Sequence, residues 1–367
     1  MGRPGRRRRA RCARRAGSAR AAPGPWPGAR PWGRSRHPVP PAAGPPRRTR
    51  AAGVRQDVRG VREEHGQEGN PRAREPSMSQ STTLTVLGAG ALGAAMATRL
   101  GRTGHEVRLW NRTSEKASAA AEHAEGVTAV EDLGDAVAGA SVVFTVLRDG
   151  PAVAEVMSAA FARLADDAVW VQASTVGPSS ATDLAGLARD HGVAYLDAPV
   201  SGSTDPALQG TLIWLVAGSE DVLARARPVL DDLGSSVLHV GTGAEGSAVK
   251  LALNAWMAAS TVAMSDVLAL CDALGVDHAA LVRALEAGPL AMPYELQKIG
   301  AMDDEAYAPG FGVRLALKDI DLAASADVPS SLFQAVRDRL EQTVAAGHGK
   351  DDLAAVDYRR QKRSSAA

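Results

Sequence analysis

The chain has 367 residues, enough for two domains with additional segments, and its formal charge of +1 combines two oppositely charged parts. Residues 1–77 carry 20 arginines, no lysine and five acidic residues, a net charge of +15, whereas the rest of the chain carries 22 basic and 36 acidic residues. An acidic, well-mixed body argues against a nucleic-acid partner, and two cysteines argue against a disulfide framework. No apolar run reaches the ~20 residues that span a bilayer, so we expect a cytoplasmic protein without a membrane partner.

The N-terminal segment is arginine, proline and glycine in more than half of its positions and shows no helical or strand periodicity. We expect residues 1–80 to be a disordered extension or the result of a misassigned start, with Met78 as the natural N-terminus. A transit peptide would be rich in arginine, but twelve prolines would break its amphipathic helix. A basic nucleic-acid-binding arm fits the charge, yet nothing downstream supports such a partner.

From Thr83 onward, short apolar, β-branched runs alternate with segments of helical periodicity. Strands are predicted at 83–87, 105–110, 127–130, 141–147, 168–173, 193–197, 211–217 and 237–240. Helices are predicted between them at 91–100, 114–123, 133–137, 151–165, 180–191 and 222–233. This alternation predicts an α/β domain over residues 81–242, with a doubly wound, mostly parallel sheet of the Rossmann type.

The pattern changes near Gly243. Residues 244–274 contain no strand signal and no proline, only helix-forming periodicity. Further helices are predicted at 278–287, 294–301, 313–326, 330–346 and 351–362. The sequence therefore predicts an all-helical C-terminal domain over residues 243–367 that begins with one long helix.

A glycine-rich loop follows the first predicted strand and precedes a helix. It consists of Gly88, Ala89, Gly90, Ala91, Leu92 and Gly93. The first glycine permits a tight turn, the second lets the backbone approach a pyrophosphate, and the third lets helix and strand pack closely. Because the helix N-terminus also favours negative charge, this loop predicts a bound dinucleotide.

The end of the second predicted strand indicates which dinucleotide binds. An NAD site needs a carboxylate there to hold the ribose hydroxyls, but this chain has Asn111, Arg112 and Thr113. Arg112 could bind a 2′-phosphate in a bidentate manner, and Thr113 could donate a hydroxyl to it. We therefore expect NADP, with NAD as the less favoured alternative.

Two polar clusters are candidates for the chemistry. Lys250 lies in an apolar helical stretch, where burial would lower its pKa, and Asn254 follows on the same helical face. Such a lysine suits a general acid/base, and the amide of Asn254 could orient the substrate. Ser201 and Gly202 follow the carboxyl end of a strand, where a hydroxyl and free N–H groups could hold a substrate carboxylate.

These blocks resemble, in the same order, the β-hydroxyacid dehydrogenases, the family of 3-hydroxyisobutyrate dehydrogenase and of the tartronate and glyoxylate/succinic semialdehyde reductases. Further matching blocks are 96–97, 142–150, Ser174-Thr175, 197–202 and 317–319. The resemblance implies an NADPH-dependent oxidoreductase that interconverts a small aldehyde or keto acid and its hydroxy acid. It also implies that Leu147, Thr175 and Lys318 contact the cofactor, that Lys250 is the general acid/base, and that the helical domain forms a homodimer.

The chain departs from the family pattern after Gly202. Ser203 stands where a second glycine is frequent, a form that resembles the glyoxylate/succinic semialdehyde reductase branch. Thr204 and Asp205 stand where that branch commonly has a lysine, so the charge preference for the substrate stays open. The particular carbonyl acid and the physiological direction are therefore not assigned.

Three other functions are compatible with parts of this sequence. An imine reductase shares the architecture but usually lacks the lysine, and a non-catalytic NADP-binding sensor would be expected to lose both Lys250 and the Ser201–Gly202 pair. Binding of nucleic acid through residues 1–77 would need independent support. The eight histidines show no metal-ligand spacing and are expected at the surface or at strand edges, so no metal is predicted.

Overall fold

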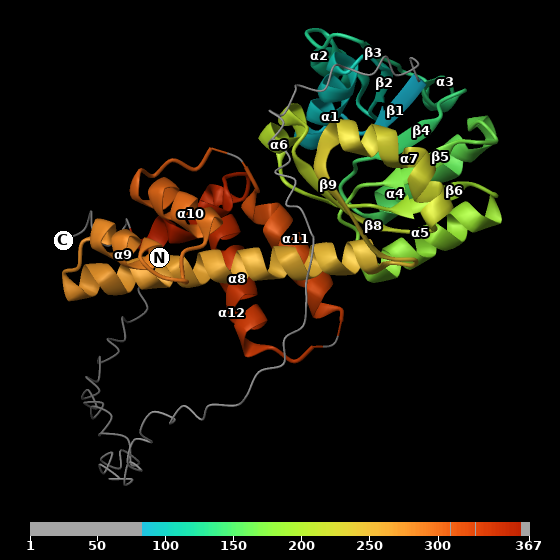
Figure 1. Ribbon diagram of the computed structural model, residues 1–367. Helices are drawn as coiled ribbons and strands as arrows, with labels where there is room; N and C mark the ends of the chain where they lie inside the picture. Colours follow the sequence, from blue (N-terminus) through green and yellow to red (C-terminus); the bar gives the residue numbers. More distant parts are fainter. Residues whose placement is uncertain (1–82, 309, 327, 361–367) are drawn as a thin grey trace, which may run out of the picture. The chain divides into compact units, whose positions relative to one another are not determined.

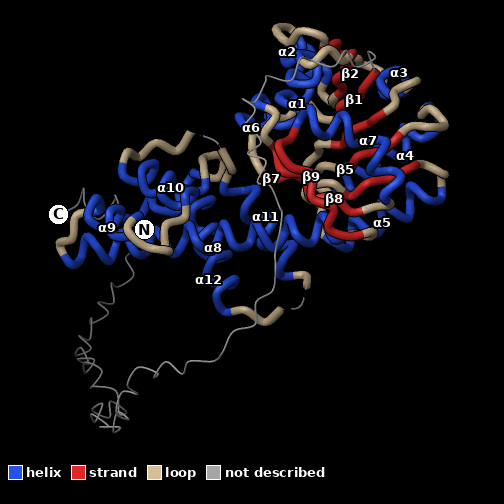
Figure 2. Tube along the Cα trace, in the orientation of Figure 1, coloured by secondary structure: helices blue, strands red, loops and turns tan. Residues whose placement is uncertain are grey.

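The computed structural model of the protein describes residues 83–308, 310–326 and 328–360 (Figure 1). The extension predicted at 1–80 lies outside these residues. Within them, an α/β domain with one large sheet precedes a domain made of helices, as the sequence predicts (Figure 2). The fold class is thereby confirmed.

The sheet of the described residues has nine strands. They are β1 (Thr83–Leu87), β2 (Glu106–Trp110), β3 (Val127–Ala129), β4 (Val142–Thr145), β5 (Val169–Gln172), β6 (Ala194–Asp197), β7 (Val200–Ser201), β8 (Leu212–Ala217) and β9 (Gly234–Gly241). Their order is β3-β2-β1-β4-β5-β6-β8-β7, with β9 paired to β8. All pairings are parallel except those of β8 with β6 and β7, so the carboxyl ends of β1, β2, β4 and β5 share one edge.

Helices cover both faces of the sheet. They are α1 (Ala91–Arg102), α2 (Ser114–Ala121), α3 (Leu133–Val137), α4 (Gly150–Ala160), α5 (Pro178–Asp190), α6 (Thr204–Gln209) and α7 (Glu220–Leu233). Side chains of α1, α6 and α7 share a buried core with Trp214, and those of α3, α4 and α5 share another with Trp170. Both indoles are fully buried, and each satisfies its N–H by a hydrogen bond, to Leu230 O and Thr145 Oγ1 respectively.

The helical domain is built around one long helix. Its elements are α8 (Glu245–Leu274), α9 (His278–Glu286), α10 (Pro293–Asp303), α11 (Val313–Ala324) and α12 (Ser331–Thr343). The core contains residues of α8, α10, α11, α12 and the segment Leu353–Asp357. Length and composition alone make α8 able to cross a bilayer, contrary to our expectation from the sequence. This is weak evidence, because a core helix meets the same criterion, and Leu251, Ala258 and Leu268 of α8 are buried.

Several element predictions need correction. The helix expected at 351–362 is instead a short 3-10 helix over Leu353–Asp357, and helix formation resumes only at Tyr358. The cause is Asp352, whose Oδ1 accepts both the Ala354 N–H and the Lys298 ammonium and so caps a new start. The helix expected to run to residue 346 is present: α12 ends at Thr343 and continues as a π-helical turn over Val344–His348, which is distorted at Gly347 with a φ of 104°. The short elements β7 and α6 have no counterpart among the predicted elements.

Candidate active site

The glycine loop has the geometry of a phosphate cradle. Gly88 has a φ of +123°, and a Cβ there would lie 2.2 Å from the Val146 carbonyl oxygen. A Cβ on Gly93 would lie 2.0 Å from the Gly88 carbonyl oxygen, whereas a Cβ on Gly90 would meet nothing within 4 Å. Helix α1 begins after Gly90 without a side-chain cap and without an acidic residue in its first turn. Gly88 and Gly93 therefore allow the close packing, and Gly90 leaves open space at free N–H groups where a pyrophosphate could lie.

The turn after β2 separates the predicted cofactor residues into two groups. Asn111 Oδ1 accepts a hydrogen bond from Ala89 N at 3.1 Å, and its Nδ2 donates to Thr113 O at 2.9 Å. Asn111 thus ties the glycine loop to this turn instead of presenting a free amide. Arg112 and Thr113 are exposed, and Thr113 precedes α2 without capping it through its side chain. Those two side chains are available to a ligand.

The turns after β4 and β5 are held together by Ser174, a residue that site prediction passed over. Ser174 Oγ accepts from Leu147 N at 2.9 Å and donates to Thr145 O at 3.1 Å. The side chain of Gln172 in turn binds both the N–H and the carbonyl of Ser174. Leu147 and Thr175 are thereby positioned at one edge of the sheet. In the sequence, the only indication of these hydrogen bonds is Gln172, a polar residue at the end of an apolar strand, because a buried amide needs hydrogen-bond partners.

Hydrogen bonds connect this edge of the sheet to the helical domain. Lys318 Nζ donates to Thr175 O at 2.8 Å and to Asp319 Oδ1 at 2.6 Å. The other carboxylate oxygen, Asp319 Oδ2, accepts from Asn254 Nδ2 at 2.5 Å. Asp319 and Asn254 are both buried. The structure thus brings together three predicted site residues, Thr175, Lys318 and Asn254, through a carboxylate that was not predicted as a site residue.

Lys250 lies on α8, one turn before Asn254, with a half-buried side chain. Burial lowers the pKa of its ammonium from the usual 10.5 to about 8. The negative charge of Asp319 opposes this lowering, and the positive charge of Lys318 contributes to it. Among the described residues, Lys250 has no hydrogen-bond partner. An ammonium with a pKa near neutrality and free N–H groups can exchange a proton with a bound molecule.

The first turn of α8 is fastened to the sheet by Asp197, at the end of β6. Ser247 N and Ser247 Oγ each donate to the Asp197 carboxylate at 2.7 Å. A Cβ on Gly246 would lie 2.4 Å from Asp197 O and 2.5 Å from Leu215 O, so only glycine permits this approach. Burial raises the pKa of Asp197 to about 6 against the effect of both Ser247 hydrogen bonds. Lys250, one turn further along, takes its position from this anchor.

Ser201 and Gly202 follow the carboxyl end of β6, as the sequence predicts, but in a short strand of their own. Ser201 is part of β7, which pairs with β8 in the antiparallel direction, and Gly202 follows with a φ of +123°. A Cβ on Gly202 would lie 2.8 Å from the Leu212 side chain. In the described part of the chain, no hydrogen bond joins this pair to Lys250 or Asn254. In the described residues, the Ser–Gly pair and Lys250 are therefore not linked by a direct hydrogen bond.

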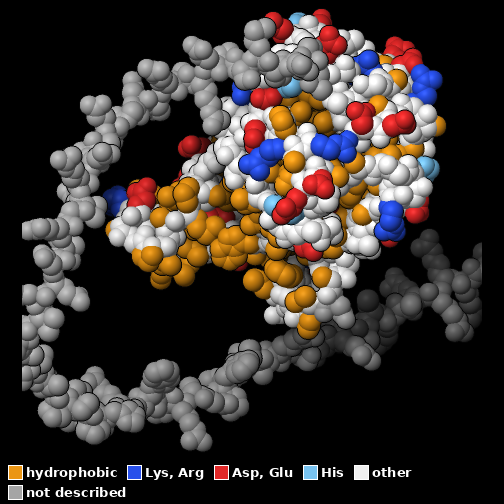
Figure 3. Space-filling view, turned by 45° about the vertical axis from the view of Figure 1, so that its right-hand side comes forward, with side chains coloured by type: hydrophobic (Ala, Val, Ile, Leu, Met, Phe, Trp, Pro, Cys, Tyr) orange, Lys and Arg blue, Asp and Glu red, His pale blue; other side chains and the backbone are white. Residues whose placement is uncertain are grey.

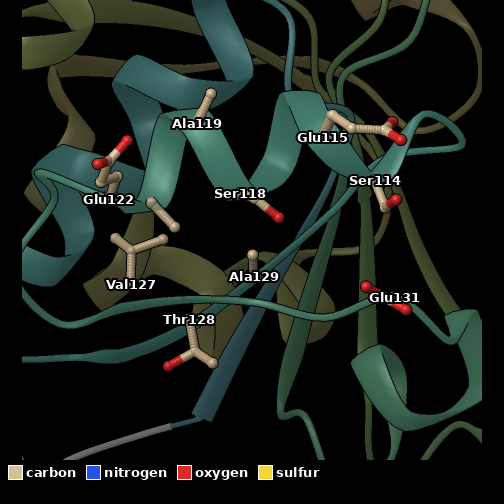
Figure 4. Close-up of a pocket in the computed structure, with 10 residues that line it drawn as sticks. Ser114, Glu115, Ser118, Ala119, Glu122, Val127, Thr128, Ala129 and Glu131 are labelled. Carbon is tan, nitrogen blue, oxygen red and sulfur yellow. The ribbon is translucent and has the colours of Figure 1, made fainter.

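A separate hollow lies between α2 and β3, at the edge of the sheet (Figure 4). Ser114, Ser118 and Thr128 line it together with the carboxylates of Glu115, Glu122 and Glu131. Lys250, Asn254 and Lys318 come from other elements, α8 and α11. Three carboxylates and no cation disfavour an anionic group inside this hollow.

In the described part of the chain, the histidines are not gathered into a metal-binding group. Among the described residues, no group of three or more His, Cys, Asp or Glu side chains could hold a metal ion. Of the two places expected for the histidines, the surface and the strand edges, His105 is not at the surface: it is buried and directly precedes β2. Its Nε2 lies 2.8 Å from Asp232 Oδ2, an interaction that compensates the burial of the ring.

Comparisons with known proteins agree with this arrangement. A family model described as the NAD binding domain of 6-phosphogluconate dehydrogenase matches residues 83–241. A second, described as NAD-binding of NADP-dependent 3-hydroxyisobutyrate dehydrogenase, matches residues 244–358. The chain is 31% identical to a probable 3-hydroxyisobutyrate dehydrogenase of Mycobacterium bovis, over 78% of this chain and all of that protein. It is 28% identical to the chloroplastic glyoxylate/succinic semialdehyde reductase 2 of Arabidopsis thaliana, over 75% of this chain and 78% of that protein.

A solved structure is similar over the same region. The 3-hydroxyisobutyrate dehydrogenase of Mycobacterium tuberculosis with L-serine superimposes with a TM-score of 0.70 at 30% identity. The match covers 76% of this chain and 98% of that one.

Proposed function

Because the chain belongs to the β-hydroxyacid dehydrogenase family, whose members named above act on small hydroxy acids, we propose that it is an NADPH-linked reductase of small carbonyl acids with Lys250 as the general acid. Membership makes it an NAD(P)-dependent oxidoreductase; the identity of the cofactor and of the proton donor are our proposals. The observation that carries them is the lowered pKa of Lys250 beside the bonded pair Asn254–Asp319.

The residues divide the reaction between them. When bound, the dinucleotide supplies the hydride that reduces the carbonyl carbon. Lys250 gives a proton from its ammonium to the carbonyl oxygen, which gains negative charge in the reduction, and the neutral amine is reprotonated from water. In the reverse direction the neutral amine accepts the hydroxyl proton. A pKa of about 8 leaves both forms accessible near neutral pH.

Asn254 acts beside the lysine. Its Nδ2 is held by Asp319, which fixes the amide plane and directs its carbonyl oxygen away from that bond. A free acceptor oxygen one helical turn from Lys250 can receive a hydrogen bond from the substrate hydroxyl or from the lysine. Ser201 and the N–H groups around Gly202 are proposed to bind the substrate carboxylate, once a substrate spans the distance to Lys250.

The preference for NADPH follows from the turn after β2. Arg112 and Thr113 are exposed there, and no carboxylate stands at the end of the strand to repel a 2′-phosphate. The side chain of Asn111 holds this turn by hydrogen bonds to the backbone of Ala89 and Thr113. A guanidinium bound to a phosphate forms charge-assisted hydrogen bonds that NADH cannot make.

The proposal is tested with the full chain and a panel of small aldehyde and keto acids, following the oxidation of NADPH and of NADH. We expect turnover of at least one of these acids with NADPH preferred, and a fall of roughly two to four orders of magnitude in the Lys250→Ala variant. Lys350→Ala, at an exposed lysine, is the control and should keep full activity. Tight NADPH binding without turnover of any acid would contradict the proposal and favour a sensor.

A further inference from the structure

A row of polar side chains crosses three adjacent strands at their carboxyl ends. In the parallel register, Thr145 of β4 pairs with Gln172 of β5, and Gln172 pairs with Asp197 of β6. All three side chains are fully buried. Figure 3 shows charged side chains on the surface of the molecule, whereas this row lies beneath it. Because buried polar groups need hydrogen-bond partners, the partners of the row show what it holds in place.

Gln172, in the middle of the row, holds the turn that follows β5. Its Oε1 accepts a hydrogen bond from Ser174 N at 2.6 Å, and its Nε2 donates to Ser174 O at 3.0 Å. Ser174 Oγ in turn accepts from Leu147 N, in the turn after β4. Leu147 and Thr175 are the residues of these turns that are expected to contact the cofactor. The Gln172 amide therefore fixes the cofactor side of the proposed site.

The same amide acts on Asp197, its neighbour in the row. A primary amide has two N–H groups, and Ser174 O takes one of them. Burial raises the pKa of Asp197 to about 6, while hydrogen bonds from Ser247 and from the Gln172 side chain lower it. Gln172 thus favours the ionised carboxylate. That form can accept the two bonds from Ser247 at 2.7 Å, whereas a protonated carboxyl loses acceptor capacity.

The ionisable groups around Asp197 give its carboxylate no support. The negative charge of Glu245, in the first turn of α8, adds to the effect of burial and raises the pKa of Asp197 further. Burial and the charge of Asp197 raise the pKa of Tyr195 well above its usual value, so this phenol stays neutral. The adjoining strands β5 and β8 contain no ionisable residue. The ionisable residues of α5 are exposed, namely Asp183, Arg189 and Asp190. Among these neighbours, the ionised form is favoured by hydrogen bonds and by no cation.

We propose that Gln172 is a positioning residue that couples the two sides of the site. Through Ser174 it holds the turns on the cofactor side, and through Asp197 and Ser247 it holds the start of α8, one turn before Lys250. Carbonyl reduction needs the nicotinamide and the proton donor in register, and a displacement of about 1 Å can slow a reaction about 10²-fold. This inference rests on the proposed function, because it describes how that site is held together.

The pH dependence of kcat tests this role in the full chain. In the wild type we expect an acid limb near pH 6, where Asp197 takes up a proton and releases Ser247, besides the alkaline limb near pH 8 from Lys250. Gln172→Met has a similar shape but no N–H groups, so the acid limb should move up by roughly one pH unit while the alkaline limb stays. Gln172→Glu keeps an acceptor for Ser174 N but sets a second carboxyl beside Asp197, so it should move the acid limb in the same direction.

Ser174→Ala is the matched control. This variant loses the Oγ hydrogen bonds to Leu147 and Thr145 but keeps both backbone hydrogen bonds to Gln172. We expect it to raise the KM for NADPH and to leave the acid limb in place, since the start of α8 is still held. An acid limb that stays in place in both Gln172 variants, with only a uniform loss of rate, would contradict the coupling and leave Gln172 as a residue of the core.

Amide hydrogen exchange, followed by mass spectrometry, gives a readout that needs no turnover. The N–H groups of a helix's first turn lack acceptors within the helix, and that of Ser247 is held by Asp197 instead. Near neutral pH, Gln172→Met should exchange faster than the wild type around both Leu147 and Ser247, and Ser174→Ala around Leu147 alone. Exchange around Ser247 that is equal in Gln172→Met and the wild type would overturn the inference. The expected exchange pattern in a chain that reduces no carbonyl acid would instead refute the proposed function and support the coupling.

Discussion

Asn254 Nδ2 and Asp319 Oδ2 form a buried hydrogen bond of 2.5 Å between the long helix α8 and helix α11. The same carboxylate holds Lys318, which reaches Thr175 in the α/β domain. One carboxylate therefore orients the amide beside Lys250 and attaches the helical domain to the edge where the nicotinamide is expected. The proposed site therefore depends on the hydrogen bonds of Asp319 as well as on Lys250.

Replacing Asp319 by Asn should impair catalysis more than folding. The variant keeps the shape but loses the negative charge that opposes the lowering of the Lys250 pKa, and it releases Lys318 and Asn254. We expect the pKa of Lys250 to fall further and kcat to drop by roughly 10²-fold, as misplacement of catalytic groups does. Profiles of kcat against pH measure both effects. An unchanged profile with unchanged kcat would show that Asp319 is merely structural.

The glycine loop offers a matched pair of variants. Gly88→Ala places a Cβ against the Val146 carbonyl at a positive φ, so we expect clear destabilisation, of about 1–3 kcal/mol or more. Gly90→Ala has space and an extended backbone, so it should fold normally but obstruct the pyrophosphate. Thermal unfolding and NADPH fluorescence titration separate the two effects. Normal NADPH affinity in a folded Gly90→Ala chain would argue against this loop as the phosphate site.

Local sequence signals were sufficient for the fold class and for part of the site. The spacing of Gly88, Gly90 and Gly93 and the four-residue separation of Lys250 and Asn254 are properties of a short stretch. Such stretches can be interpreted without knowing what packs against them.

The missing parts depend on contacts between distant segments. Asp319 meets Asn254 across 65 positions, and Asp197 meets Ser247 across 50. The spacing of apolar residues along the sequence gives no information about pairs so far apart. The apolar run after Asp352 resembles a helix, and only the capture of Asp352 by Lys298 changes its form. Likewise, β7 has two residues and depends on β8 for its existence.

Arg112→Ala should distinguish the two dinucleotides. The variant loses charge-assisted hydrogen bonds to a 2′-phosphate, typically worth about 1.5–3 kcal/mol. We therefore expect the KM for NADPH to rise roughly 10- to 100-fold while the KM for NADH stays unchanged. Arg227→Ala, at an exposed arginine on α7 paired with Asp231, serves as the control. Equal effects on both cofactors would exclude a specific phosphate contact at Arg112.

The raised pKa of Asp197 should make the stability of the folded chain depend on pH. Its pKa is about 6 in the folded chain, above the usual 3.8, so between these values the folded state holds a proton that the unfolded state has released. The free energy of unfolding should therefore fall by about 3 kcal/mol from this group as the pH rises from about 4 to about 6. Asp197→Asn does not titrate and should lack this contribution.

Urea unfolding at several pH values measures that difference. The stability gap between the wild type and Asp197→Asn should change across this window, whereas the gap for Glu155→Gln, at an exposed residue of α4, should stay constant. A constant gap for Asp197→Asn as well would contradict the assigned ionisation of the anchor.

The most direct measurement of the central claim is the pH dependence of kcat/KM for carbonyl reduction by the wild type and by Lys250→Arg. We predict that the wild-type rate falls tenfold per pH unit above an apparent pKa of about 8, where the ammonium loses its proton. Arginine stays protonated and cannot transfer its proton, so Lys250→Arg should be slower by roughly 10²- to 10⁴-fold and should lack this limb. The same limb in Lys250→Arg, at a similar rate, would show that another group donates the proton.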